Sequence, residues 1–361
     1  MTTKNSIEIF AFCGDSVPGV KKKLRSISNS FFNNGFIVKL SLFEFSMFRS
    51  HFSYIYSIYK SNKKYLFVRI APNCLANYFL LPVLSFKRFK KHYVIIEIPT
   101  PLHIGTYEIL SSDFSLFKKI YYLLNQYFNF PLSILPAHRI LQYGEESFYF
   151  SAFIRHKFKL ISNGIETDRL SKRVSYPRNT SIFKFVGIAT IGRWHGYDRL
   201  IESISEHNKT EDVKCYFDII GDGPEKDNLV KLVDRLDVAQ YVTFHGFIDS
   251  SICGEYLSNC HMAVTTLAGH RANLYVSSEL KSREYCASGI PFISSQIDPD
   301  FGTSTNFIYL VPNDDLKIEL NDVINWYYDL SFDDFFIDEM HNFAVKNLDY
   351  DKKVIEYING L

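Results

Sequence analysis

The sequence has no long apolar segment. Its apolar runs, such as "YFLLPVLSF" and "YVIIEI", are much shorter than the roughly 20 residues that a membrane-spanning helix needs. The opening residues, "MTTKNSIEIFAF", lack a basic region followed by a long apolar stretch, so we expect no secretory signal. These absences predict a cytoplasmic protein that meets a membrane, if at all, as a peripheral protein on its inner face.

Cysteine is scarce and scattered. The six cysteines lie at positions 13, 74, 215, 253, 260 and 286, with no C-x-x-C pair and no histidine at metal-ligand spacing. We therefore expect reduced, buried thiols. The chain also lacks the dinucleotide-binding fingerprint, the P-loop pattern and a D-x-D motif in a suitable loop. The expectation is a protein without a cofactor or a bound metal, in which side-chain cations take the place of a metal.

The net charge of +1 hides a strong asymmetry between the two halves of the chain. Residues 1–165 contain 21 Lys and Arg against 8 Asp and Glu, so the totals of 40 and 39 leave 19 basic and 31 acidic residues for the remainder. Such a split indicates two domains with different partners, the basic one facing an anionic surface or ligand. The basic clusters match no nucleic-acid-binding module. We expect "VKKKLR" and "FKRFKKHY" to meet an anionic membrane surface, although a solvated basic face would explain them too.

Short apolar strands alternate with helical segments in two successive blocks. The first block contains "IEIFAFC", "FIVKLSLF", "KYLFVRI", "HYVIIEI", "ILQYG" and "KLISNG", and the second "FKFVGIAT", "KCYFDIIGDGPE", "YVTFHGF", "CHMAVTTL" and "PFISS". This alternation is typical of an α/β fold with parallel, doubly wound sheets. We predict two Rossmann-like domains, residues 1–165 and 166–340, facing a cleft. A helical segment, residues 341–361, is expected to pack back on the first domain.

The segment "SSELKSREYCASGIPFISS", residues 277–295, is unusually charged for one that ends in an apolar run. A helix over residues 279–288 would place Glu284 in one stripe with Leu280 and Ala287. A carboxylate on the apolar side of a helix is costly unless another group pairs with it. The segment therefore needs a partner for Glu284.

Two explanations for this charge remain open from the residues alone. In one, ion pairs form within the helix, between Lys281 and Glu284 and between Glu279 and Arg283. In the other, the first turn faces an anionic ligand. With Ser278 or the serine before it as N-cap, the free N–H groups and Lys281 together would favour a phosphate.

Two further turns between a strand and a helix carry residues suited to binding a phosphate. In "GIATIGRWHGYDRLIES", Gly192 allows close backbone approach and the guanidinium of Arg193 suits phosphate oxygens, with His195 close by. Alternatively, Arg193 is an ordinary loop residue and Trp194 a core anchor. The second, "IIGDGPEKDNL", has a glycine-rich turn at residues 221–223, which could equally be no more than the start of a helix.

Taken in order, these motifs resemble those of the retaining glycosyltransferases of family 4, which have the GT-B fold. The matching pieces are "SNGIE", "GRWHGYDRLIES", "IIGDGPEKDNL", "VTFHGFI" and "LKSREYCASGIPFI". The resemblance is close over residues 161–295 and weak before them, where "GDSVPGVKKKLRSI" is similar to the first glycine loop of the family. "EIPTP" resembles a loop of members that build capsular polysaccharides and exopolysaccharides.

The resemblance implies roles for individual residues. It makes Glu284 the acceptor for the ribose hydroxyls of a nucleotide sugar, and Arg193 and Lys281 the catalytic cations that hold the diphosphate. Glu97 or His103 would handle the acceptor hydroxyl, although Glu97 could equally be a structural residue. The full set of expected donor-binding residues is Gly19, Gly192, His195, Gly221, Asp222, Gly223, Phe247, Ser278 and Glu284.

The chain departs from the family pattern at two positions. The family usually has a second Glu eight positions before Glu284, where this sequence has Val276, and it has a Lys where this sequence has His195. The first departure affects the expected recognition of the donor sugar. The second makes one contact to the diphosphate weaker or pH-sensitive.

The expected function is transfer of a sugar from a UDP- or GDP-sugar to a glycan or lipid-linked oligosaccharide in surface polysaccharide synthesis, with retention. An epimerase acting on the nucleotide sugar alone is a second possibility, because it would use the same fold without an acceptor. A nucleotide-sugar-binding subunit without catalysis is a third, suggested by Val276. Turnover with an acceptor would separate these three functions.

Overall fold

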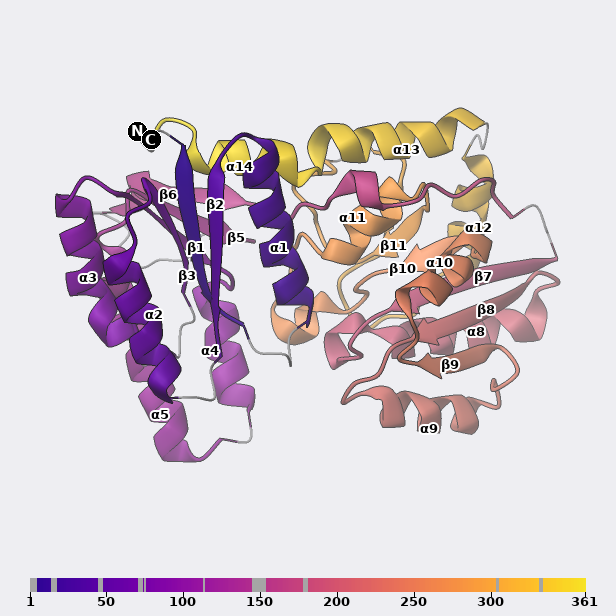
Figure 1. Cartoon of the computed structure of the whole chain (residues 1–361). Coiled ribbons are helices and arrows are strands. Elements are labelled where there is room, and N and C mark those ends of the chain that lie inside the picture. Colours follow the sequence, from indigo (N-terminus) through magenta and orange to yellow (C-terminus); the bar gives the residue numbers. More distant parts are fainter. Residues whose placement is uncertain are drawn as a thin grey trace. The chain divides into compact units, whose positions relative to one another are not determined.

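The computed structural model describes residues 5–13, 18–44, 48–70, 74, 76–112, 114–144, 154–177, 181–302, 305–330 and 334–361. The chain divides into two compact units, Met1–Glu166 with Asp349–Leu361, and Thr167–Leu348. Each unit is built on one six-stranded sheet whose paired strands are all parallel. The prediction of two α/β units with doubly wound parallel sheets is therefore confirmed (Figure 1).

The sheet of the first unit has the strand order β2-β1-β3-β4-β5-β6. Ile9 of β1 lies in register with Leu40 of β2 on one side and with Phe67 of β3 on the other. The strands are short, and those at the centre are almost entirely buried, as expected for a sheet covered on both faces. Their bounds are β1 Ser6–Phe12, β2 Ile37–Phe43, β3 Tyr65–Arg69, β4 Tyr93–Ile98, β5 Arg139–Tyr143 and β6 Phe158–Ile161.

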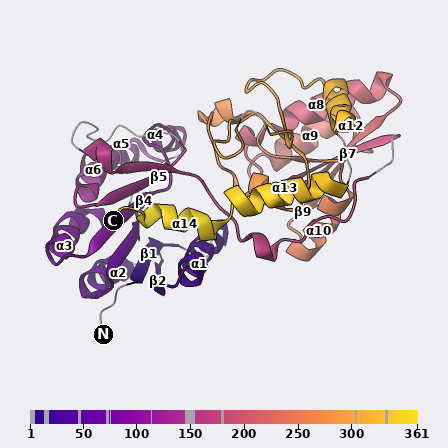
Figure 2. The ribbon, with the colours of Figure 1, turned by 90° about the horizontal axis from the view of Figure 1, so that it is seen from above.

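Helices cover both faces of this sheet. Alternate strand residues pack against α1 and α14 on one face and against α2, α3 and α6 on the other. The two views of the ribbon show α14 running beside α1 (Figure 2). The helices are α1 Pro18–Asn33, α2 Phe48–Lys60, α3 Asn77–Phe89, α4 Leu102–Ser111, α5 Leu116–Leu124, the π-helix η1 Asn125–Asn129, α6 Phe130–Ile134, the short η2 Arg155–Lys157 and α14 Tyr350–Ile358.

The sheet of the second unit has the order β12-β11-β10-β7-β8-β9. Its strands are β7 Ile182–Ile188, β8 Lys214–Ile220, β9 Val242–Gly246, β10 Met262–Val264, β11 Phe292–Ser294 and β12 Ile308–Leu310. Its helices are η3 Thr167–Arg169, η4 Arg193–His195, α8 Tyr197–Thr210, α9 Lys226–Leu236, α10 Ser250–Asn259, η5 Gly269–Ala272, α11 Leu280–Ala287, α12 Leu320–Asp329 and α13 Asp334–Asn347.

The C-terminal segment forms two helices that belong to different units. Helix α13 packs on α11 in the second unit, where His341 Nδ1 lies 2.7 Å from the carbonyl oxygen of Ala287. Asp349 then caps α14 by accepting a hydrogen bond from the N–H of Asp351, and α14 joins the first unit. The segment expected to begin at residue 341 thus belongs to the first unit only from residue 349.

The topology places a candidate site at the carboxyl edge of the second sheet. Strand β7 is followed in sequence by β8 on one side, whereas β10 lies on its other side, so the strand order reverses between β7 and β10. Ligands of such sheets bind beyond the carboxyl ends of the strands at this reversal. The segments after β7 and β10 contain η4, η5 and the start of α11, and with them Arg193, His195 and Lys281.

Among the described residues, no helix combines the length and apolar character that crossing a membrane requires. All six cysteines are free thiols, five of them buried and Cys253 half-buried.

Candidate active site

Helix α11 (Leu280–Ala287) forms where the sequence predicted a helix, but its first turn begins differently. Glu279 has extended backbone angles and occupies the N-cap position, without a side-chain hydrogen bond to the first turn. The expected N-cap at Ser278 or Ser277 is therefore wrong, and the Ser278 side chain is buried instead. The carboxylate of Glu279 therefore lies at the N-terminus of α11 and can form hydrogen bonds or ion pairs with groups outside the helix.

The inward side of α11 carries Arg283, and not Glu284 as the predicted stripe required. Arg283 is completely buried, whereas Glu284 is half-buried. The guanidinium of Arg283 donates to Asp298 Oδ1 at 2.7 Å and also pairs with Asp300, both in the segment after β11. The ion pair between Arg283 and Glu279 that helical spacing suggested is therefore wrong. These long-range bonds instead fix the rotation of α11 against the sheet.

Lys281 projects from the first turn of α11 into a buried polar cluster. Its ammonium Nζ lies 3.5 Å from Glu279 Oε2, and neither of these two buried atoms has a hydrogen-bond partner among the described residues. The hydroxyl of Thr266, just after β10, donates to the other oxygen of Glu279. The carboxylate paired with Lys281 is thus Glu279 and not Glu284. Burial, partly offset by Glu279, lowers the pKa of Lys281.

The hydroxyl of Tyr197 adds a third buried polar atom to this cluster. It too lacks a hydrogen-bond partner among the described residues. Burial and the nearby charge of Glu279 raise the pKa of Tyr197, so that the phenol stays protonated and remains a donor. Buried polar groups in native proteins are nearly always satisfied. The ammonium of Lys281 and Oε2 of Glu279 form an ion pair only with each other, and the phenol of Tyr197 has no hydrogen-bond partner among the described residues. Together they indicate a place where a polar ligand or water completes the bonding.

The corner after β7 forms the short helix η4 (Arg193–His195). Arg193 and Trp194 are both exposed, so Trp194 is not the core anchor that was the alternative to a binding role. Its ring covers Gly192, where an added Cβ would come within 2.6 Å of the indole. Gly192 is therefore required by the packing of Trp194, and the Arg193 guanidinium is left at the surface, where an anion can reach it.

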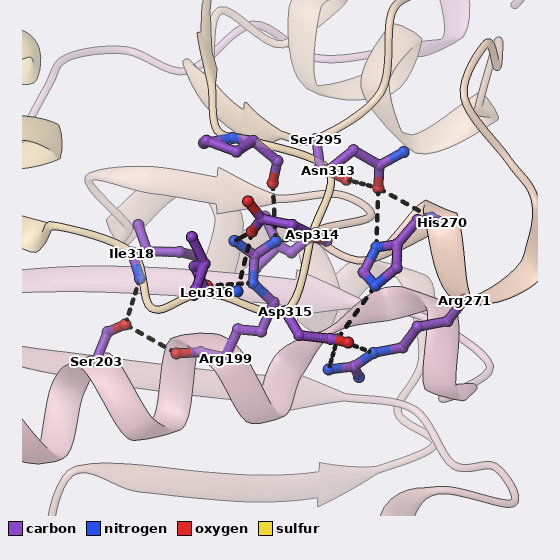
Figure 3. A network of polar contacts seen from close by, with 12 residues as sticks. Arg199, Ser203, His270, Arg271, Ser295, Asn313, Asp314, Asp315, Leu316 and Ile318 are labelled. Atoms are coloured by element: carbon purple, nitrogen blue, oxygen red, sulfur yellow. Dashed lines mark hydrogen bonds and ion pairs between the residues drawn. The ribbon is translucent and has the colours of Figure 1, made fainter.

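A network of ion pairs that the sequence did not reveal holds η4 in place. Figure 3 shows the part of this network in which Arg271 meets Asp315. All three carbonyl oxygens of η4 accept hydrogen bonds from residues 267–271. Arg271 reaches both oxygens of Asp198 at 2.8 Å and Asp315 at 2.7 Å, while also donating to the carbonyl of Arg193. These bonds join the loops after β7, β10 and β12 into one rigid structure. We call these joined loops, which contain residues 193–198, 267–271 and 315, the rim.

Arg199 of α8 ties the same rim to the core. It is almost completely buried, and it donates to the carbonyl oxygens of Leu316 and Pro312 at 2.7 and 3.0 Å, to that of Leu267, and to the carboxylate of Asp314 at 3.0 Å (Figure 3). Because each of these bonds reaches a loop far away in the sequence, local spacing could not predict them. The hydrogen bonds of Arg199 fix the backbone of the loops after β10 and β12, which have no regular secondary structure at these residues.

His195 is buried beside Lys281 and is neutral. His195 Nδ1 lies 3.0 Å from the backbone nitrogen of Gly192 and 3.2 Å from its carbonyl oxygen, so the neutral ring finds a partner in Gly192 in either tautomer. Burial, followed by the charge of Lys281, lowers the pKa of His195 to about 2. A ring that stays neutral near neutral pH favours the weaker contact to the diphosphate over the pH-sensitive one, and that contact stays a prediction.

We expect the activity to show no titration of His195 between pH 6 and pH 8. A base whose folded pKa is far below its usual value is already neutral throughout this range. The ratio of kcat/KM between the wild type and His195→Asn should therefore stay constant, whatever its absolute value. A ratio that changes about tenfold across the range would show that His195 carries a proton in the working enzyme.

The glycine-rich turn after β8 serves the packing of two loops. A Cβ at Gly221, whose φ is +120°, would lie 1.9 Å from the carbonyl oxygen of Ala189, and one at Gly223 would lie 2.4 Å from that of Ile191. The carboxylate of Asp222 pairs with Lys226 at 3.0 Å and accepts from the N–H of Gly223. Gly221 and Gly223 thus bring this turn against the segment that leads into η4.

Glu284, in α11, and Phe247, between β9 and α10, lie outside the loops joined by Arg271. Glu284 is close enough to Cys253, near the start of α10, to contribute with burial and Asp249 to the raised pKa of that thiol. Phe247, between β9 and α10, is 77% exposed. Lys281 and Glu284 of one helix therefore lie near two different loops, Lys281 near Thr266 after β10 and Glu284 near Cys253 of α10.

The candidates of the first unit are distributed differently. Gly19 is exposed in the first turn of α1, and most of the loop before it, residues 14–17, lies outside the described residues. His103 is exposed on α4. Glu97 is completely buried in β4, where Oε1 pairs with Arg69 at 2.8 Å and Lys23 at 3.2 Å. This geometry favours the structural interpretation of Glu97 over a role in proton transfer.

Sequence comparison identifies a family for the second unit. Residues 181–329 match the family described as "Glycosyl transferases group 1". This range contains η4, η5 and α11, and with them every candidate residue that the structure places at the carboxyl edge of the second sheet. No curated protein matched the sequence.

Solved structures of similar fold cover nearly the whole chain. Sucrose-phosphate synthase from Thermosynechococcus elongatus has a TM-score of 0.65 at 12% identity, over 98% of this chain and 97% of that one. The catalytic domain of starch synthase IV from Arabidopsis thaliana, bound to ADP and acarbose, has a TM-score of 0.66 at 10% identity, over 98% and 97%. HepE from Anabaena, in complex with UDP, has a TM-score of 0.61 at 14% identity, over 99% and 100%. The expected GT-B fold is confirmed by these structures, and residues 181–329 are similar to the group 1 glycosyltransferases.

Proposed function

We propose that the protein transfers a sugar, with retention, from a nucleoside diphosphate sugar to a glycan or lipid-linked oligosaccharide during surface polysaccharide synthesis. The observation that carries the proposal is the buried ammonium of Lys281 at the strand-order reversal of the second sheet. It has a carboxylate 3.5 Å away and no hydrogen bond among the described residues. A diphosphate would supply the oxygens that this group lacks. Retention rests on the resemblance of the motifs to those of retaining enzymes.

The proposed chemistry places charge where the site has cations. As the bond between the anomeric carbon and the diphosphate oxygen breaks, negative charge develops on the departing diphosphate. Preorganised cations and N–H donors in a site with little water stabilise such charge strongly. Lys281 supplies one cation, held by α11, and Arg193 supplies a second from the surface of η4. The Arg271 network holds the backbone of Arg193, and the bonds of Arg283 to Asp298 and Asp300 hold the helix that carries Lys281, so little reorganisation is required.

The acceptor is proposed from the first unit and its charge. Residues 1–165 carry 21 basic against 8 acidic residues, which suits an acceptor presented at an anionic membrane surface. His103, exposed on α4, is the candidate to meet the acceptor hydroxyl, because Glu97 is enclosed by Arg69 and Lys23.

A two-stage experiment tests the proposed function. Thermal unfolding is first measured with a panel of UDP- and GDP-sugars, since a true donor raises the melting temperature by mass action. The UDP bound to HepE makes uridine nucleotides the first choice. Release of nucleoside diphosphate is then measured with and without lipid-linked acceptors. Sugar interconversion without an acceptor would identify an epimerase, and binding without any release would identify a binding subunit.

We expect Glu284→Gln to weaken donor binding by about tenfold to a hundredfold. Gln has the shape of Glu but lacks the negative charge that would accept two ribose hydroxyls, and hydrogen bonds to charged groups are worth roughly 1.5–3 kcal/mol each. The dissociation constant of the nucleoside diphosphate is the measurement. Glu339→Gln is the matched control, because it makes the same change at an exposed position of α13. Equal effects of the two changes would remove the ribose role from Glu284.

A further inference from the structure

Helix α5 (Leu116–Leu124) has an apolar face that none of the described residues of the first unit covers. None of its nine residues is buried. Leu116, Phe117, Ile120, Tyr121 and Leu124 are 71, 86, 46, 42 and 53% exposed. Their spacing of i, i+1, i+4, i+5 and i+8 puts them on one side of the helix. An amphipathic helix normally turns this side toward the core, whereas α5 turns it toward solvent.

The apolar face of α5 continues onto α3 and α2. Tyr121 contacts Tyr78 of α3. Farther along, Phe79 of α3 packs on Phe52 of α2, with ring centroids 6.2 Å apart, and all four of these rings are exposed by 42% or more. We use the name aromatic surface for these exposed side chains of α2, α3 and α5. An uncovered surface of this kind marks an interaction site.

The charge around the aromatic surface selects an anionic partner. No acidic residue occurs in residues 45–96, which contain nine Lys and Arg, and none occurs in residues 114–144. Lys118 of α5 lies 4.0 Å from the ring centroid of Phe114, and Lys90 lies 5.7 Å from that of Phe86. Aromatic rings interleaved with lysines are typical of segments that lie in the headgroup region of a bilayer.

We propose that the aromatic surface docks on an anionic lipid bilayer, with the apolar face of α5 inserted among the headgroups. This deepens the membrane part of the proposed function, but it makes no use of the transfer site, so the two can fail separately. It also changes which residues are expected to bind. In "FKRFKKHY", Lys87 is buried and donates to the carbonyl of Ser61 at 2.5 Å. In "VKKKLR", Lys23 is buried against Glu97.

Vesicle co-sedimentation of the full chain tests the proposal. The vesicles are phosphatidylcholine alone, or phosphatidylcholine with about a third phosphatidylglycerol. The test variant is Phe117→Glu with Leu124→Glu. The control is Val174→Glu with Phe335→Glu, which changes net charge equally at residues of the second unit that are 94% and 77% exposed. We expect the wild type and the control to bind the anionic vesicles, and the partition coefficient of the test variant to fall at least tenfold.

Three outcomes would overturn the proposal. The first is a wild type that does not bind anionic vesicles, and the second is a test variant that binds them as well as the control does. The third is a wild-type dimer in light scattering that the test variant converts to monomer, because the surface would then join two copies of the chain. Unchanged thermal unfolding verifies that both variants fold, as expected for exposed positions.

A second measurement reports directly on α5. The two natural tryptophans, Trp194 and Trp326, both lie in the second unit, so Phe117→Trp adds a signal at the proposed insertion site. Its emission should shift to the blue with anionic vesicles and be quenched by brominated lipids. Emission that is unchanged while the protein sediments with vesicles would place the contact elsewhere and contradict the proposal.

Discussion

Replacing Lys281 with Met should lower kcat by about a hundredfold to a thousandfold and leave the fold intact. This is the size of effect measured when one preorganised group that stabilises a developing oxyanion is removed. Met fills the space of the lysine chain but carries no charge. The ammonium has no hydrogen bond among the described residues, and burial already disfavours its charged form, so the folded protein loses little. The melting temperature should move by a few degrees at most.

Two controls separate a role toward the diphosphate from a role toward Glu279. Glu279→Gln removes the same ion pair but keeps the cation, so it should retain far more activity than Lys281→Met. Lys231→Met removes an exposed lysine from α9 and should leave kcat unchanged. Lys281 would be no more than the ion-pair partner of Glu279 if Lys281→Met and Glu279→Gln reduced kcat equally.

The fold could be predicted because its signals are local. A strand buried on both faces must be a short run of apolar residues, and a helix that covers it must begin after a turn. Strand β4, "YVIIEI", shows both, since it is apolar except for Glu97 and ends before the prolines that precede α4. The positions at which the chain changes between units are less evident. Helix α14 joins the first unit through contacts with α1, which no local pattern reveals.

The pairing of charges could not be predicted for the opposite reason. Helical spacing offered Glu279 as the partner of Arg283, and the structure instead provides Asp298 and Asp300 from a different loop. A fully buried guanidinium needs several acceptors in fixed positions. Loops that converge at a sheet edge supply them better than one residue on the same helix does. Arg199 and Arg271 follow the same rule, each binding loops that are distant in sequence.

Glu97→Gln should destabilise the protein by about 3–5 kcal/mol, the usual result of removing one partner from a buried ion pair. Among the described residues, Glu97 is the only carboxylate that pairs with Lys23 or Arg69. Although burial raises its pKa, Arg69 and then Lys23 outweigh burial and hold the pKa at about 2. The carboxylate therefore stays ionised at working pH, and Gln would leave two buried cations without a counter-ion. The melting temperature of the full chain measures the loss.

The pH dependence of this loss identifies its cause. Burial, partly offset by Glu97, lowers the pKa of Lys23 to about 7, so at pH 9 the folded protein already holds Lys23 neutral while the unfolded chain keeps it charged. Wild-type stability contributed by Lys23 therefore rises with pH from about 7 to 10.5, whereas that contributed by Glu97 is complete above about 4.5 and is lost as pH falls toward 2. With Glu97→Gln, a charged Lys23 loses its partner at pH 6 but not at pH 9.

The melting-temperature difference between wild type and Glu97→Gln should accordingly be larger at pH 6 than at pH 9. Lys23→Met provides the comparison, because it leaves Glu97 paired with Arg69 at 2.8 Å and removes only the cation that burial opposes. It should cost much less stability than Glu97→Gln. A different result would contradict this structural role. If Glu97→Gln unfolds like the wild type at both pH values but does not transfer sugar, Glu97 acts on the acceptor. Replacing a residue with a purely structural role would lower activity only by lowering stability.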